Sequence, residues 1–179
     1  MDQLRRLFSV KGKVEASRLK LFQAAYSWCH DRALAEDMMQ DTLTKALASK
    51  SSLKEPKYLD TWLFRILINT WHDFLRKQKD MVELDEFCIT STADVVGDYQ
   101  RGEIVTRVRK AVSELPIPLR EVISLADLSG FKYQQIANIL DIPVGTVMSR
   151  LFRARKKMEQ LLYDFNTEVS NVTELRKIK

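Results

Sequence analysis

A short helical pattern, a tight turn and a longer helical pattern follow one another in the second half of the chain, and they constrain the fold most. The short pattern spans residues 133–140 and places Ile136, Ala137 and Leu140 on one side. The turn spans residues 141–143 and begins with an aspartate, which tolerates the left-handed backbone of a tight turn. The apolar residues of the longer pattern recur at steps of four and three: Val147, Leu151, Ala154, Met158 and Leu161. This order predicts a helix-turn-helix.

The opposite face of the longer predicted helix is dense in positive charge. In the helix-turn-helix, the second helix enters the DNA major groove, so this face is predicted to bind DNA. The side chains expected near base edges are Met148, Ser149, Phe152 and Arg153. The side chains expected near phosphates are Arg150, Arg155, Lys156 and Lys157. The alternative is a surface helix that is basic by chance.

The first half of the chain is predicted to form three or four helices, because apolar residues recur there with helical spacing. The clearest helices cover residues 14–29, 33–49 and 57–78, with Asp31 placed to cap the second and Pro56 to begin the third. The second helix carries a polar row opposite its apolar face: Asp37, Gln40, Asp41 and Lys45. By periodicity alone this row is an ordinary solvated surface.

The third predicted helix has two distinct sides. Its core side is predicted to hold Leu59, Leu63, Ile66, Thr70 and Phe74. Its second side holds Trp62, Arg65, Asn69, His72 and Arg76, and the basic residue Lys77 follows. An aromatic ring, an amide and cations in one row offer stacking, base hydrogen bonds and phosphate contacts to a single strand of nucleic acid. An equally weighted alternative places Trp62 in the core and the other side chains in water.

Composition favours a helical protein divided into two parts. The chain has only 5 glycines and 4 prolines in 179 residues, too few for the many tight turns of an all-β fold. Residues 80–100 carry six acidic residues and no lysine or arginine, whereas both flanking parts are net basic. We therefore predict an all-α fold of two small helical domains joined by an acidic linker: residues 1–79, linker 80–101, helix-turn-helix domain 102–165 and tail 166–179. Domains of this size bury little apolar surface and gain little stability from their own cores. We therefore expect them to dock on each other or on a partner.

Several classes of function find no support in the sequence. No phosphate-binding loop, dinucleotide-binding glycine motif or zinc-protease motif is present, so neither an enzyme nor a cofactor is expected. Cys29, His30, His72 and Cys88 do not have zinc-ligand spacing, so no metal site is expected. The basic N-terminus lacks a long apolar run and no stretch could cross a membrane, so a cytoplasmic protein is predicted.

Two sets of segments resemble one family in the same order. AEDMMQDTLTKAL and TWLFRILINTWHDFLRK in the first half are similar to the polymerase-binding and −10-reading segments of extracytoplasmic-function (group 4) sigma factors. LPIPLREVISLADLSGFKYQQIANIL and IPVGTVMSRLFRARKKMEQLL resemble the −35-reading domain of that family. The resemblance covers about residues 20–163. It implies a dissociable subunit of bacterial RNA polymerase that recognises promoters. It also implies an anti-sigma factor as a partner. If that anti-sigma factor is linked to the membrane, it would hold the protein at the cytoplasmic face.

The resemblance also implies roles for individual residues. Asp37, Gln40, Asp41 and Lys45 would contact core RNA polymerase, and the loop 49–57, with Leu53 and Lys54, would hold a flipped −10 base. The other −10-binding residues would be Trp62, Arg65, Asn69, His72, Arg76 and Lys77. The −35-binding residues would be Met148, Ser149, Arg150, Phe152, Arg153, Arg155 and Lys156. Met148 stands where the family often has a lysine or arginine. The alternative function is a stand-alone helix-turn-helix regulator that binds DNA without polymerase.

Overall fold

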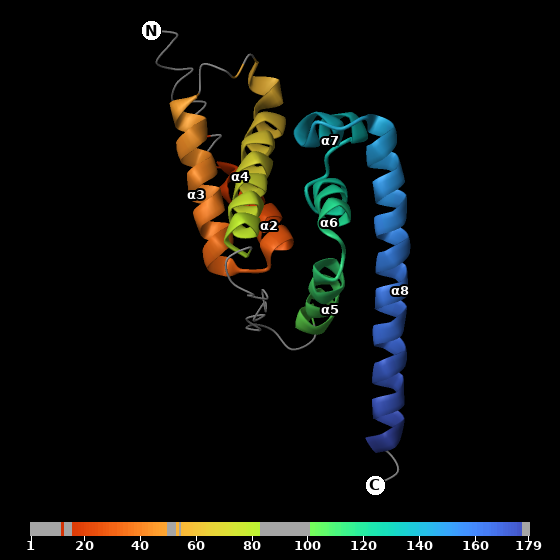
Figure 1. The fold of residues 1–179 in the computed structure, drawn as a ribbon. Helices are drawn as coiled ribbons and strands as arrows, with labels where there is room; N and C mark the ends of the chain where they lie inside the picture. Colours follow the sequence, from red (N-terminus) through yellow and green to blue (C-terminus); the bar gives the residue numbers. More distant parts are fainter. Residues whose placement is uncertain (1–11, 13–15, 50–52, 54, 83–100, 177–179) are drawn as a thin grey trace.

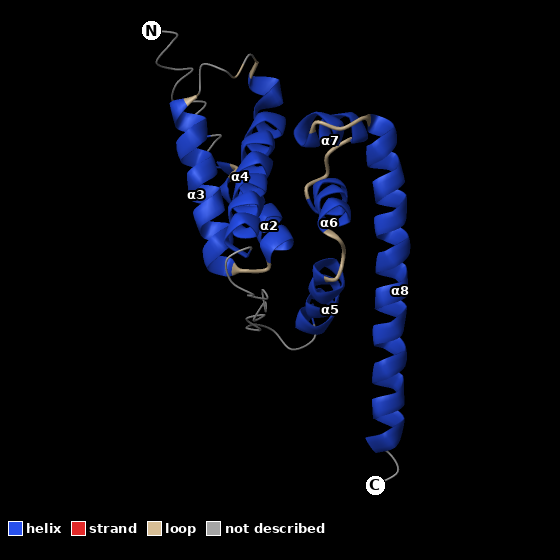
Figure 2. Cartoon of the chain, viewed as in Figure 1, coloured by secondary structure: helices blue, strands red, loops and turns tan. Residues whose placement is uncertain are grey.

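The computed structural model describes residues 12, 16–49, 53, 55–82 and 101–176, without the side chains of 80–82, 101–103 and 164–176. Every regular element in this described part is a helix (Figure 2). The predicted all-α class is therefore confirmed.

The first half forms a bundle of three helices. They are α2 (Arg18–Cys29), α3 (Arg32–Ala48) and α4 (Leu59–Val82), and a 3-10 turn, η2 (Pro56–Tyr58), leads into α4. The carboxylate of Asp31 accepts a hydrogen bond from the backbone N–H of Leu34 at 2.9 Å, which confirms the predicted N-cap of α3. Helix α4 ends four residues later than predicted, because residues 79–82 include no glycine or proline that would stop it.

The second half contains the predicted helix-turn-helix. Its elements are α5 (Arg101–Ser113), α6 (Ile117–Ile123), the π-helical turn η3 (Ser124–Leu128), α7 (Tyr133–Leu140) and α8 (Val144–Arg176). Asp141 adopts φ 54°, so the left-handed turn residue predicted between α7 and α8 is confirmed. Val147, Leu151 and Ala154 are at most 2% exposed, as the spacing of the core row predicts. The helical backbone of α8 continues to Arg176 and includes most of the predicted tail.

The two halves pack side by side. Helices α5, α6 and α7 lie between the α2–α4 bundle and α8, which runs along the outer side (Figure 1). The rings of Phe64 in α4 and Phe131 meet edge to face, with their centroids 4.7 Å apart. A single cluster of buried apolar residues contains members from both halves. The expected docking of the two small halves is therefore confirmed, and it joins their apolar residues into one core.

Polar contacts also join the halves. The hydroxyl of Ser27 donates to the hydroxyl of Ser124 across 2.8 Å, and both side chains are buried. The guanidinium of Arg120 donates to the backbone carbonyls of Trp28, Ser113 and Leu115 at 2.5, 2.6 and 3.0 Å. Arg120 thus ties the end of α2 to the α5–α6 connection. Most of the acidic segment, residues 83–100, lies outside the described residues.

Candidate nucleic-acid interface

The outer face of α8 carries the side chains that were predicted to read DNA. Phe152 is 71% exposed and Met148 is 53% exposed, although both are large apolar side chains. Ser149 and Arg153 are exposed beside them, and Arg150 is partly buried. The hydroxyl of Ser149 donates to the Thr146 carbonyl at 3.0 Å, which leaves its lone pairs free to accept. One helix therefore presents these predicted base-reading residues together on its exposed side.

Arg155 differs from the other cations of this face because it has a carboxylate partner. Its Nη2 and Nε atoms donate to the two carboxylate oxygens of Asp127, at 2.7 and 3.3 Å. The hydroxyl of Tyr133, at the start of α7, is a second group that favours the charged guanidinium. These two partners, Asp127 foremost, raise the pKa of the guanidinium further above its ordinary value. The charge of Arg155 is thus largely balanced within the protein.

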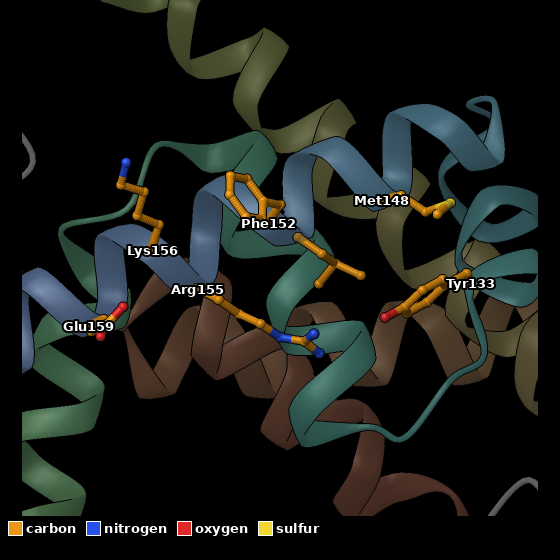
Figure 3. A pocket seen from close by; sticks show the side chains of 7 residues that line it. Tyr133, Met148, Phe152, Arg155, Lys156 and Glu159 are labelled. Carbon is orange, nitrogen blue, oxygen red and sulfur yellow. The ribbon is translucent and has the colours of Figure 1, made fainter.

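A shallow hollow lies between α7 and this part of α8. In Figure 3 the hydroxyl of Tyr133 points toward the guanidinium of Arg155 across the hollow, and Lys156 extends away from it. The residues that line the hollow are Tyr133, Met148, Leu151, Phe152, Arg155, Lys156 and Glu159. Its walls are mainly apolar, and the guanidinium of Arg155 lies between α8 and Tyr133.

The start of α7 is fixed by local hydrogen bonds. The side chain of Gln135 accepts from the backbone N–H of Lys132 at 2.9 Å, which holds the chain as it enters the helix. Ile136, Ala137 and Ile139 are buried beneath α7, so its orientation on α4 and α8 is set by apolar packing. Tyr133 is therefore presented from a well-anchored helix end.

Part of the predicted −10 surface lies against the second half of the chain. Trp62 and Arg65 line a groove together with Asn138 and Asp141 of the α7 end, and the other lining residues are Tyr58, Thr61, Gln134, Ala137, Ile142, Pro143 and Val144. The guanidinium of Arg65 lies 4.0 Å from the Asp141 carboxylate. Trp62 is partly buried and packs against the core. Its position therefore lies between the two predicted alternatives, a side chain in the core and a side chain that faces nucleic acid.

His72 is engaged across the same boundary. Its Nε2 atom lies 2.9 Å from a carboxylate oxygen of Glu121 in α6. Glu121 is only 4% exposed, and its hydrogen bond is the main cause that raises the pKa of His72 above the ordinary 6.5. A buried carboxylate beside an imidazole favours the protonated ring and so an ion pair.

The remaining predicted −10 residues are distributed around the exposed parts of α4. Asn69 and Lys77 are exposed, and Arg76 forms an ion pair with Asp73 one turn before it. Leu53 is partly buried and packs against the apolar core. Lys54 and residues 50–52 of the predicted base-holding loop lie outside the described residues. The structure therefore places Asn69, but not Trp62 or His72, on a fully accessible surface.

The polar row predicted to bind polymerase lies on the outer side of α3. Asp37, Gln40 and Asp41 are exposed and share one face of the helix. Lys45 extends the row, but its ammonium donates to the Thr70 hydroxyl of α4 at 2.9 Å. Two carboxylates and an amide thus remain directed outward, whereas Lys45 also ties α3 to α4.

Sequence reasoning did not identify three residues that shape these surfaces, Tyr133, Glu121 and Asp127, and it assigned Asp141 only to the turn. Glu121 carried a clue, since it is a carboxylate within an apolar run and such a group needs a partner when buried. Its partner, His72, lies 49 residues away, and no feature of the neighbouring sequence indicates the pairing.

Among the described residues, no group of three or more histidine, cysteine or acidic side chains could hold a metal ion. Burial raises the pKa of the Cys29 thiol to about 11, so this thiol is unreactive at neutral pH.

Comparisons with known proteins assign both halves to one family. Residues 14–80 match the family Sigma-70 region 2, and residues 106–158 match Sigma-70, region 4. The chain is 34% identical to "ECF RNA polymerase sigma factor EcfG" of Rhodopseudomonas palustris over 81% of its own length and 79% of that protein's. It is 31% identical to "RNA polymerase sigma factor SigV" of Bacillus subtilis, over 76% and 81%.

Solved structures give the same relationship. One is the Bartonella quintana sigma factor RpoE in complex with the anti-sigma factor NepR, with a TM-score of 0.73 and 33% identity over 90% of this chain and 97% of that one. Another is CnrH in complex with the cytosolic domain of CnrY, with a TM-score of 0.66 and 25% identity over 88% and 90%. Both similarities extend over the two halves.

Proposed function

The chain belongs to the extracytoplasmic-function sigma factors of the sigma-70 family, and we propose that its two halves divide promoter recognition between them. As a sigma factor it directs RNA polymerase to promoters and is a non-enzymatic regulator of transcription initiation. Under this proposal α8 reads the −35 element, α4 and the loop before it read the −10 element, and the exposed row of α3 binds core polymerase.

The observation that carries the −35 assignment is the opposed character of the two faces of α8. Leu151 and Ala154 are buried against the rest of the domain, whereas Ser149, Phe152 and Arg153 point outward among lysines and arginines. A recognition helix needs this division, because one face must hold its place in the domain while the other enters the major groove. Met148, Arg150, Arg155 and Lys156 complete the proposed −35 surface.

The −10 assignment is supported by the side of α4 that carries Trp62, Arg65, Asn69 and His72. A tryptophan ring can stack on an unpaired base, and the amide of Asn69 is exposed for hydrogen bonds to one. Arg76, Lys77, Leu53 and Lys54 extend the proposed surface along the helix and into the preceding loop. Because Arg65 and His72 face carboxylates of the second half, we infer that the halves must separate before this surface can bind the −10 strand.

The need for the two halves to separate gives a physical reason why promoter binding would depend on core polymerase. A sigma factor whose −10 residues face its own second half would bind promoter DNA weakly when free. Core polymerase would stabilise the separated halves by binding the α3 row, with Asp37, Gln40, Asp41 and Lys45 as the proposed contacts. A stand-alone regulator would need no such opening and would bind its DNA alone.

We propose an anti-sigma factor as a further partner, because the solved structures similar to this chain are complexes with the anti-sigma factor NepR and with the CnrY cytosolic domain. No helix in the described part of this chain combines the length and the apolar character that crossing a membrane requires. We infer that the protein acts in the cytoplasm, where its polymerase is, and that any attachment to the membrane face is made through that partner.

Binding to purified core RNA polymerase tests the proposal. The wild-type chain is expected to co-migrate with core polymerase on a sizing column, and Asp37→Lys/Asp41→Lys is expected to abolish this because it reverses two exposed charges of the α3 row. Glu114→Lys, an exposed charge reversal in the other half, serves as the matched control and should still co-migrate. Sequence-specific DNA binding by the protein alone, without co-migration, would favour the stand-alone regulator.

A further inference from the structure

We propose that the hollow between α7 and α8 reads the 5-methyl groups of thymines in the −35 element. This inference rests on the proposed function and names the chemical feature that this surface recognises. It assigns Met148, Phe152 and Tyr133 as specificity-determining residues, and Arg155 with Asp127 as the fixed ion pair beside them.

The apolar lining is the first reason. Phe152, Met148 and Tyr133 are 71%, 53% and 42% exposed, so three large side chains that water solvates poorly meet on a face otherwise rich in cations. Leu151, which is 2% exposed, forms the floor. We expect exposed apolar side chains on a DNA-binding face to be buried against an apolar group of the DNA. The thymine methyl is the apolar group that base edges present in the major groove.

The fixed position of Arg155 is the second reason. Two of its five N–H donors are taken by the Asp127 carboxylate, and the Tyr133 hydroxyl points toward the guanidinium (Figure 3). The pairing with Asp127 fixes the guanidinium and balances its charge. A base edge that enters between Met148 and Phe152 therefore meets methylene, methyl and ring carbon, because the guanidinium is held beside Asp127.

The charges at the edges orient the DNA. Lys156 extends away from the hollow (Figure 3) and is free of any carboxylate in the described part of the chain, so it can neutralise a phosphate. Glu159 closes the C-terminal end of the hollow, where its carboxylate would repel the backbone. Base edges are therefore directed to the N-terminal part of the site, between Met148 and Phe152.

Replacement of thymine by uracil tests the inference, because it removes the methyl and leaves the hydrogen-bonding edge unchanged. Holoenzyme reconstituted with core polymerase selects −35 sequences from a duplex library with random −35 positions. The selected duplex is then remade with deoxyuridine in place of each thymine in turn. Binding is expected to weaken about three- to fivefold at each thymine whose methyl enters the hollow.

Two variants connect the methyl to the hollow. Met148→Ala and Phe152→Ala shorten exposed side chains and leave the buried row of α8 intact, so the domain should still fold, as circular dichroism would verify. Each is expected to bring the thymine-to-uracil affinity ratio close to one at a selected position. Lys156→Ala is the matched control on the same helix. It should weaken binding to both duplexes equally and reduce the salt dependence of log K by about one.

The outcomes separate the inference from the function on which it rests. Selected −35 elements that contain no thymine, or uracil tolerated at every thymine, would overturn the inference while leaving the −35 assignment in place. A uracil penalty that persists unchanged in both Met148→Ala and Phe152→Ala would also overturn it, since the methyl would be read elsewhere. A holoenzyme with no preference for any −35 sequence would instead contradict the proposed function.

Discussion

The imidazole of His72 in α4 and the carboxylate of Glu121 in α6 meet at 2.9 Å across the boundary between the two halves. Glu121 is almost completely buried, whereas the His72 side chain is 43% exposed. The pair therefore connects a proposed −10 residue to the interior of the −35 domain. Its strength depends on whether the imidazole carries a proton.

We predict that this contact makes the stability of the packed arrangement depend on pH. The hydrogen bond to Glu121 raises the folded-state pKa of His72 above its ordinary 6.5. A group with a raised folded pKa adds stability that is fully present below the unfolded pKa and is lost as the pH rises through the folded pKa. The free energy of unfolding in urea should therefore fall as the pH rises above 6.5 and through the raised folded-state pKa of His72.

The matched variant is His72→Gln, which keeps a polar side chain but cannot titrate. Its free energy of unfolding should change less than that of the wild type over the same pH interval. Because His72 is partly exposed, solvent will reduce the size of the difference. Equal slopes for both proteins would show that protonation of His72 does not stabilise the packed arrangement.

The carboxylates that face the −10 residues should weaken DNA binding by the free protein. The double variant Glu121→Gln/Asp141→Asn removes two negative charges beside His72 and Arg65 with little change in shape. We expect it to bind a single-stranded −10 oligonucleotide about three- to tenfold more tightly at low salt, because a larger fraction of molecules has the surface uncovered. Fluorescence anisotropy measures the change.

Asp37→Asn/Asp41→Asn provides a control that removes the same charge at exposed positions of α3, and core polymerase, which these residues are proposed to contact, is absent from this assay. If it raises the affinity as much as the double variant does, the gain reflects net charge rather than release of the −10 surface. Small-angle scattering should also show a larger radius of gyration for Glu121→Gln/Asp141→Asn alone.

Arg120 should be one of the residues most sensitive to truncation. Its guanidinium donates to three backbone carbonyls, of Trp28, Ser113 and Leu115, and one of these belongs to the other half. Arg120→Ala leaves these acceptors without their donor, and we expect a loss of about 2–3 kcal/mol in the free energy of unfolding. Urea denaturation followed by circular dichroism measures it. Arg153→Ala, which removes an exposed arginine, should change stability by less than about 0.5 kcal/mol.

The parts of the fold that could be predicted from the sequence are those set by neighbouring residues. The cap at Asp31, the left-handed turn at Asp141 and the buried row from Val147 depend on residues within one or two helical turns. Helical periodicity and capping act over this range, so the pattern contains the information. The end of α4 lies at Val82 rather than at the predicted residue 78, because charged residues such as Lys79 do not stop a helix.

The contacts between distant residues could not be predicted in this way. Ser27 and Ser124 are 97 residues apart, and Asp127 and Arg155 are 28 apart. Each pair forms only after helices have docked, and nothing in the local spacing of either residue marks the other. The same limit explains why Arg155 was expected to lie near phosphates as a free cation, whereas the fold provides it with a carboxylate partner.

This difference between Arg155 and its neighbour leads to a prediction about salt. A cation that neutralises a phosphate releases a counterion, so removing it lowers the slope of log K against log salt by about one. We expect Lys156→Met to lower the slope by that amount in holoenzyme binding to −35 duplex DNA. Arg155→Met should lower it by much less, because Asp127 already balances the charge of Arg155. Binding measured from low to moderate salt gives both slopes, and a loss of about one for Arg155→Met would show that its guanidinium leaves Asp127 for a phosphate.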